Sequence, residues 1–121
     1  MDQQFRIRNE NRDCDLATRA RRASSFITRG IGLMGRRSLS RGEALILPGC
    51  KSITMFFMRF PLDIVFLDEN GVVCADLREF RPWRVSRLVP RSKLAIELPS
   101  GTLDASGTQV GDRILIEPTA A

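Results

Sequence analysis

Two side chains of this 121-residue sequence, Cys50 and Asp63, could take part directly in a reaction. Cys50 follows Pro48-Gly49 and precedes Lys51, and a thiol in a turn beside a cation can react as a thiolate nucleophile. Cysteine is also common as a small buried apolar residue, and we favour that interpretation here. Because the chain contains no histidine to act as a base, Lys51 or an arginine would have to activate the thiol.

Asp63 ends a segment, Met58 to Asp63, in which Pro61 separates two apolar runs. Proline cannot donate to a sheet ladder, so the break favours a β-bulge, and bulges often turn side chains into a site. Met58, Arg59 and Asp63 would then line a ligand site. The alternative, which we favour, is that Asp63 accepts hydrogen bonds from backbone N–H groups at the bulge and that Arg59 is its ion-pair partner.

A third candidate lies in residues 78–92, which are rich in arginine and proline and predict a long crossing loop. Trp83 stands among arginines there, close to Arg81, and such a tryptophan can stack on a base or an aromatic ligand. Arg81 and Trp83 are therefore candidate ligand-binding residues. The alternative, which we favour for Trp83, is an anchor that holds the loop on the sheet.

Other patterns exclude several kinds of site. The three cysteines are odd in number and have no CxxC spacing, which argues against a disulfide framework and against a zinc site. The carboxylates are dispersed, with no pair spaced for hydrolysis or metal binding. The glycines of Gly30-Ile31-Gly32 do not follow an expected strand, so no phosphate loop is predicted. We therefore expect no metal and no cofactor.

The net charge of +5 is unevenly distributed. Residues 1–60 contain 12 Lys and Arg against 5 Asp and Glu, whereas residues 61–121 contain 7 against 9. Arginine binds carboxylate and phosphate groups, so an anionic partner, nucleic acid included, is one hypothesis. The other, which we favour, is a solvated basic face, because a basic composition alone is a weak indication of nucleic-acid binding.

The hydrophobic pattern predicts one main helix and six or seven strands. Apolar residues between Leu16 and Met34 fall largely at helical spacing with arginines between them, which predicts an amphipathic helix over Thr18 to Thr28. Asn70-Gly71 predicts a hairpin turn, and a short helical turn is expected within residues 102–108. Strands are expected over residues 5–8, 44–47, 53–58, 63–68, 72–77, 93–98 and 113–116.

Together these elements predict a mainly β (α+β) fold, a compact barrel-like sheet, antiparallel or mixed, with the helix packed on it. No repeat or linker divides the chain, so we expect a single domain over residues 1–121 with a frayed tail at 118–121. No signal peptide is visible and no apolar run is long enough to cross a membrane. A cytoplasmic protein with no membrane partner is expected.

Four segments occur in a familiar order: Gly32-Leu33-Met34-Gly35-Arg36, then residues 57–68, then Glu97-Leu98-Pro99-Ser100-Gly101, then Val110-Gly111-Asp112-Arg113. In this order the chain resembles the bacterial and archaeal family called domain of unknown function 192, over about residues 4–117. The resemblance implies a small β-rich domain with a helix near its start. It implies no activity, because none is established for the family.

Three hypotheses of function remain, in order of preference. The first is a soluble, non-catalytic binding or accessory module for a peptide, a protein or a small ligand, which would show a groove or apolar patch beside Trp83 and Arg59. The second is nucleic-acid binding through the arginine-rich helix, with an affinity that falls steeply as salt rises. The third is a thiol- or carboxylate-dependent enzyme that uses Cys50 or Asp63.

Overall fold

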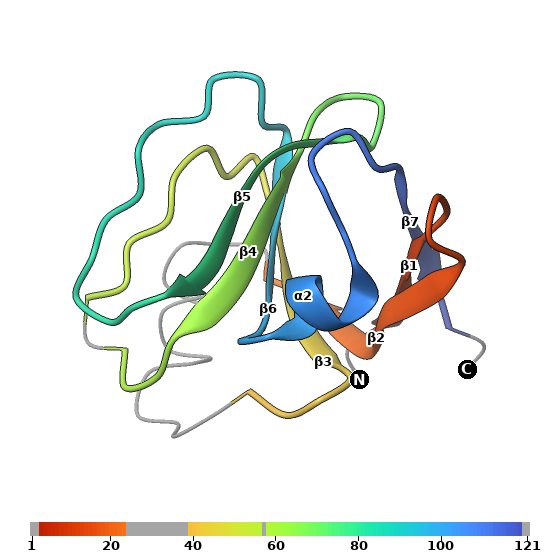
Figure 1. Ribbon diagram of the computed structural model, residues 1–121, viewed down its shortest axis with the longest axis horizontal. Coiled ribbons are helices and arrows are strands. Elements are labelled where there is room, and N and C mark those ends of the chain that lie inside the picture. The colour runs from red at the N-terminus through yellow and green to blue at the C-terminus, as the bar shows by residue number, and fades with distance from the viewer. Residues whose placement is uncertain (1–2, 24–38, 57, 120–121) are drawn as a thin grey trace.

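The computed structural model describes residues 3–23, 39–56 and 58–119. Within these residues the chain forms seven strands and one short helix, and the strands make a strongly curled half-barrel (Figure 1). In chain order the elements are β1 (Gln4–Asn9), β2 (Cys14–Arg22), β3 (Glu43–Pro48), β4 (Leu62–Leu67), β5 (Val73–Phe80), β6 (Leu94–Pro99), α2 (Thr102–Ser106) and β7 (Ile114–Pro118).

The strands follow the order β5-β4-β6-β3-β2-β1-β7 across one sheet. Strands β2 and β3 run parallel, and every other neighbouring pair in the sheet is antiparallel. The prediction of a mainly β fold with a mixed, barrel-like sheet is therefore confirmed. A membrane-crossing helix, which would need a long and largely apolar stretch, is not found among the described residues.

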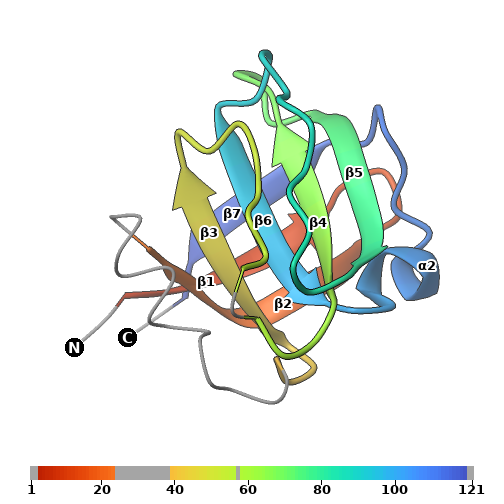
Figure 2. The same cartoon turned by 90° about the vertical axis from the view of Figure 1, so that its left-hand side faces the viewer.

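The core occupies both faces of the sheet. Figure 2 shows the segment after β3 and the segment between β5 and β6 crossing in front of β3, β6 and β4. Buried side chains of the covering segments, including Ile53, Met55 and Val89, pack there against Leu45, Phe66 and other residues of the sheet. A second cluster fills the concave side of the half-barrel, with members from β1, β2, β4, β6 and α2.

Strands β4 and β6 lie in the middle of this arrangement and are covered on both faces. All six residues of β4 are buried, and so are Ala95, Ile96, Glu97 and Leu98 of β6. A strand buried on both sides needs apolar residues at successive positions rather than at alternate ones. This explains why both strands could be recognised in the sequence as nearly continuous apolar runs.

The predicted helix over Thr18 to Thr28 is wrong in its first part, because residues 14–22 form β2. Residues 24–28 lie outside the described residues. Two register shifts occur where β2 pairs with β1: Ile7 lies opposite Ala17, whereas Phe5 lies opposite Ala20 and Arg8 opposite Asp15. The extra residues of β2 break its alternation. Leu16, Ala17 and Ala20 are consequently all buried, a spacing that imitates one face of a helix.

Two smaller predictions also need correction. Residues 53–56, predicted as part of a regular strand, form only an isolated bridge between Thr54 and Val85. The tail is tied down as far as Thr119, whose backbone N–H donates to the carbonyl oxygen of Gln4 at 3.0 Å.

Buried or half-buried aspartates hold the turns of the sheet. Asp68 accepts hydrogen bonds from the N–H groups of Asn70 and Val72 in the β4–β5 hairpin. Gly71 in that hairpin has a φ of +77°, and a Cβ there would approach the carbonyl oxygen of Ile114 to 3.2 Å, so only glycine fits without strain.

Asp112 has the same role before β7. Its Oδ2 accepts from the N–H of Gln109, from Nδ2 of Asn9 and from Nε of Arg12, which ties the 109–112 turn to the end of β1. Burial raises the pKa of Asp112, but the hydrogen bonds from Asn9, Arg12 and Gln109 outweigh it and the pKa is lowered. The pKa of Asp68 is lowered too, by the N–H groups of Val72 and Asn70.

These lowered pKa values predict how stability depends on pH. A carboxyl group whose pKa is lower in the folded state stabilises the fold above its unfolded pKa, about 4, and loses that contribution as the pH falls through its folded pKa. With no histidine in the chain, the free energy of unfolding should be nearly constant from about pH 5 to pH 8 and fall below about pH 4. Urea denaturation at a series of pH values measures this.

The variant Asp112→Asn is the check on the assignment. It should be less stable than the wild type at pH 7 and should lose less stability between about pH 5 and pH 2, because the titrating group is absent. A stability curve that already falls between about pH 7 and pH 5 would contradict this account.

Candidate functional site

Asp63 is fully buried on β4 and accepts three backbone hydrogen bonds. Its Oδ1 accepts from the N–H of Glu79 at 2.9 Å, and its Oδ2 accepts from the N–H groups of Gly101 at 3.1 Å and Leu103 at 2.8 Å. The first two bonds join β4 to β5 and to the turn after β6, and the third lies in the first turn of α2. The helix has no side-chain cap of its own, so Asp63 takes the place of one.

The β-bulge that Asp63 serves is not where the sequence places it. Between Leu62 and Ile64 the pairing partner moves from Phe80 to Leu77, so the additional residue lies on β5 rather than beside Pro61. Glu79, at this irregularity, has a φ of +48° and donates its N–H to Asp63. The expectation that Asp63 bonds backbone N–H groups at a bulge is confirmed, but the bulge belongs to the neighbouring strand.

The structure does not bring the candidates of the Met58 to Asp63 segment together. Met58 is buried in the cluster that covers the convex face of the sheet. Arg59 is exposed, and no ion pair between Arg59 and Asp63 is found in the part of the chain that the structure describes. Asp63 reaches neither solvent nor a described pocket, so these three residues do not form a common ligand site.

Cys50 is also enclosed. Its side chain is 9% exposed, and its Sγ lies 3.0 Å from the carbonyl oxygen of Ser52. Lys51, the cation predicted to activate it, instead donates to the carbonyl oxygens of Pro90 and Ser92, each at 2.7 Å. The Lys51 ammonium thus fastens the 49–56 segment to the 81–93 segment.

Trp83 is not buried against the sheet as an anchor, because its side chain is 59% exposed. Its ring lies beside that of Phe56, with 6.0 Å between the ring centroids and an interplanar angle of 32°. Its backbone N–H donates to the carbonyl oxygen of Met55 at 2.7 Å. The backbone of Trp83 therefore fastens the loop, while its indole extends a surface that Phe56 begins.

The two segments that carry these rings form a short irregular ribbon. The N–H of Met55 donates to the carbonyl oxygen of Arg84 at 2.8 Å, and the N–H of Ser86 donates to that of Ile53 at 2.8 Å. Thr54 and Val85 face each other between these two bonds. In such a pair the side chains lie on the same face of the ribbon. Ile53 and Met55 point to the core, so the opposite face is free for solvent or a partner.

We call the exposed surface of these two segments the aromatic face and define it by Phe56, Trp83, Val85 and Leu88. These four side chains are 49%, 59%, 55% and 63% exposed, which is unusual for large apolar residues that follow one another along two paired segments. Arg81, Arg84 and Arg87 lie on the same segment and are exposed. None of the three forms an ion pair with a described carboxylate.

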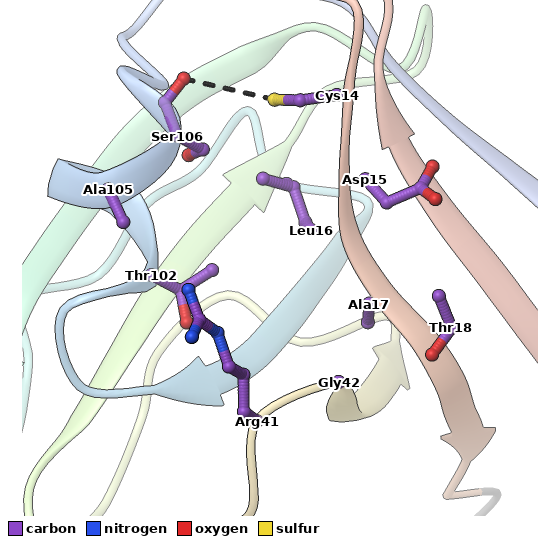
Figure 3. A pocket seen from close by; sticks show the side chains of 10 residues that line it. All are labelled: Cys14, Asp15, Leu16, Ala17, Thr18, Arg41, Gly42, Thr102, Ala105 and Ser106. Atoms are coloured by element: carbon purple, nitrogen blue, oxygen red, sulfur yellow. Dashed lines mark hydrogen bonds between the residues drawn. The ribbon is translucent and has the colours of Figure 1, made fainter.

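A separate pocket of about 250 Å³ opens between β2 and α2 (Figure 3). Cys14, Leu16 and Ser106 line one end, and Arg41 lies beside Thr102 at the other. The sequence offers no pattern that predicts this pocket, because its lining comes from three distant segments.

One acidic side chain stands among the described residues that line the pocket. This residue, Asp15, directs its carboxylate to the other side of β2, where it accepts from Arg6 and Arg8 of β1 (Figure 3). Among the described residues no three Cys, Asp or Glu side chains gather closely enough to hold a metal ion.

Removing the Asp63 carboxylate should destabilise the fold. The variant Asp63→Asn keeps the shape but offers one acceptor oxygen, so at least one buried N–H loses its partner. We expect a loss of about 2–4 kcal/mol in the free energy of unfolding, measured by urea denaturation. Asp13→Asn is the control, because the side chain of Asp13 is 90% exposed; it should cost less than about 1 kcal/mol. A loss below about 1 kcal/mol for Asp63→Asn would contradict its structural role.

If Cys50 is a buried structural residue and not a nucleophile, its thiol should react slowly in the native chain. We expect Cys50 in the native chain to react with a thiol reagent at least about 100-fold more slowly than in urea, because a buried group reacts only when the structure opens. Burial, followed by the charge of Asp68, raises the pKa of Cys74, which should also be slow. Cys14→Ser should therefore remove the fastest phase. If Cys50→Ala removes the fastest phase instead, Cys50 is the reactive thiol and the nucleophile hypothesis is supported.

Comparisons with known proteins agree on a family. The model of the DUF192 family, described as "Uncharacterized ACR, COG1430", matches residues 7–116. A UPF0127 protein from Thermococcus sibiricus is 37% identical over 102 residues, which cover 79% of this chain and 64% of that protein. The UPF0127 protein PH1112 from Pyrococcus horikoshii is 34% identical over 112 residues, which cover 89% of this chain and 96% of the relative.

A solved structure shares the fold. The crystal structure of a "putative transcription regulator" from Sinorhizobium meliloti superposes with a TM-score of 0.75 at 24% identity and covers 95% of this chain and 93% of its own. At that identity the likeness shows the fold alone. The family match spans nearly the whole described sheet, from β1 to β7, and the chain belongs to the DUF192 family, as its sequence segments indicate.

Proposed function

We propose that this chain is a non-catalytic binding module and that a peptide or protein partner docks on the aromatic face. The single observation that carries the proposal is the exposure of Phe56, Trp83, Val85 and Leu88 along two segments that are hydrogen-bonded to each other. Tryptophan and arginine dominate the energetics of protein interfaces, and both occur here on one segment.

The proposal is supported by how firmly the ribbon is held. Lys51, Met55, Trp83, Ser86 and Val89 all take part in hydrogen bonds between the two segments. Apolar side chains on a fixed backbone lose little conformational freedom when a partner covers them, so more of the contact energy remains as affinity. The proposal includes a cytoplasmic location, which the three free cysteines support.

The chain contains a matched pair of residues for the test. Val85 on the aromatic face is 55% exposed, and Val110, in the turn before β7, is 57% exposed. Val85→Ser and Val110→Ser therefore remove the same side chain at equal exposure, and a difference between them reports position alone. Trp83 is the chain's one tryptophan, so its fluorescence reports binding at the aromatic face directly.

Twelve-residue peptides should be selected from a random displayed library on the immobilised full chain and remade as free synthetic peptides. We expect binding that shifts Trp83 fluorescence, a Kd raised about fivefold by Val85→Ser, and a Kd changed less than about twofold by Val110→Ser. Failure to obtain any peptide that binds in free solution would overturn the proposal, and so would equal effects of the two variants. Tighter binding of a twelve-nucleotide oligo(dT) than of any peptide would assign the face to nucleic acid instead.

A further inference from the structure

The outer edge of the ribbon offers backbone hydrogen-bonding groups as well as side chains. Thr54 and Val85 face each other in an isolated bridge but are not hydrogen-bonded to each other. The hydrogen bonds on either side of them join Met55 to Arg84 and Ser86 to Ile53. In this arrangement the N–H and C=O of the facing residues point away from the ribbon. Within the described part of the chain the N–H groups of Val85, Arg87 and Leu88 donate to no protein group.

This edge differs from the two edges of the main sheet. At its start β5 is bonded to the 111–114 segment, since Val73 donates to the carbonyl of Asp112 and Gly111 donates to that of Val73. Further along, Arg78 donates to Asp104 and to the carbonyl oxygen of Thr108, so its side chain links that edge to the 104–108 segment. The edge at β7 ends in Pro118, which has no N–H to give. Such features discourage pairing with another chain, and the Val85–Leu88 edge lacks them.

The charges beside this edge specify what could pair with it. Arg81, Arg84 and Arg87 recur every third residue along the segment, and no described carboxylate neutralises them. Arg91, further along the chain, does have an acidic partner, because its guanidinium lies 3.7 Å from the carboxylate of Asp68. A basic partner would be repelled, whereas carboxylates would gain charge-assisted hydrogen bonds to guanidinium groups.

We propose that the partner segment is acidic and extended, and that it adds as a β-strand along the Val85–Leu88 edge. This inference rests on the proposed function and deepens it. Backbone hydrogen bonds from Val85 and Arg87, which lie two residues apart as a β-ladder requires, hold the segment. Its apolar side chains cover Trp83 and Val85, and its carboxylates bind the exposed guanidinium groups of the same segment. Addition of a strand to a free edge is a recurring mode of peptide recognition.

The probe is a capped ten-residue peptide in which Glu alternates with Val or Phe, titrated into the full chain at about 50 mM salt with Trp83 fluorescence as the readout. Replacing Glu by Lys in the peptide should abolish binding. The double variant Arg84→Gln/Arg87→Gln should raise the Kd about tenfold or more. Arg113→Gln is the control, since Arg113 is an exposed arginine outside the 81–88 segment, and it should change the Kd less than about twofold.

Methylation of the peptide's backbone nitrogens, one at a time, tests the pairing itself. A peptide in a strand directs alternate N–H groups to its neighbour, so methylation should raise the Kd at least about tenfold at every second position and little between them. A uniform response along the peptide, or equal binding of the Lys peptide, overturns the inference. Strand addition fails, and the proposed function stands, if the acidic peptide does not bind but library-selected peptides bind and Val85→Ser weakens their binding. If Val85→Ser changes the binding of no peptide, both proposals fail.

Discussion

The carboxylate of Asp63 holds three parts of the chain together by accepting a backbone hydrogen bond from each. It is sealed within β4, and it binds the N–H of Glu79 at the irregularity of β5, the N–H of Gly101 after β6 and the N–H of Leu103 in α2. A buried carboxylate is tolerated only when hydrogen bonds replace its water, and these three bonds do so. With α2 so fixed, Leu103 can close the concave cluster, and β5 can continue past its bulge toward the segment that carries the aromatic face.

Two of the segments that carry the family resemblance supply carboxylates that hold the backbone in place. Asp63 and Asp68 of the segment 57–68, and Asp112 of Val-Gly-Asp, each accept backbone N–H groups and hold turns of the half-barrel. The aromatic face, in contrast, is built from residues outside those segments, Phe56 just before one of them and Trp83 to Leu88 between two. The fold and the proposed docking surface therefore depend on different residues of the chain.

Whether a strand could be predicted from the sequence depends on how its buried residues are spaced along the chain. Strands such as β4 and β6 are apolar at nearly every position because both faces are covered, and they were predictable. Strand β2 was not, because its register shifts bury Leu16, Ala17 and Ala20 together and imitate a helix. Asp63 could be recognised as an acceptor for a bulge, whereas its bonds to Gly101 and Leu103 depend on contacts across 38 and 40 residues. Phe56 lies in an apolar run that resembles core, so its exposure could be known only from the fold.

Native-state amide hydrogen exchange tests most directly whether one carboxylate unites these segments. The account predicts that the N–H groups of Glu79, Gly101 and Leu103 exchange with the same opening free energy, within about 1 kcal/mol, and close to that of global unfolding. The N–H of Val85, which is exposed on the ribbon, should show almost no protection in the same experiment. Three clearly different free energies, or protection as low as that of Val85, would contradict the central role of Asp63.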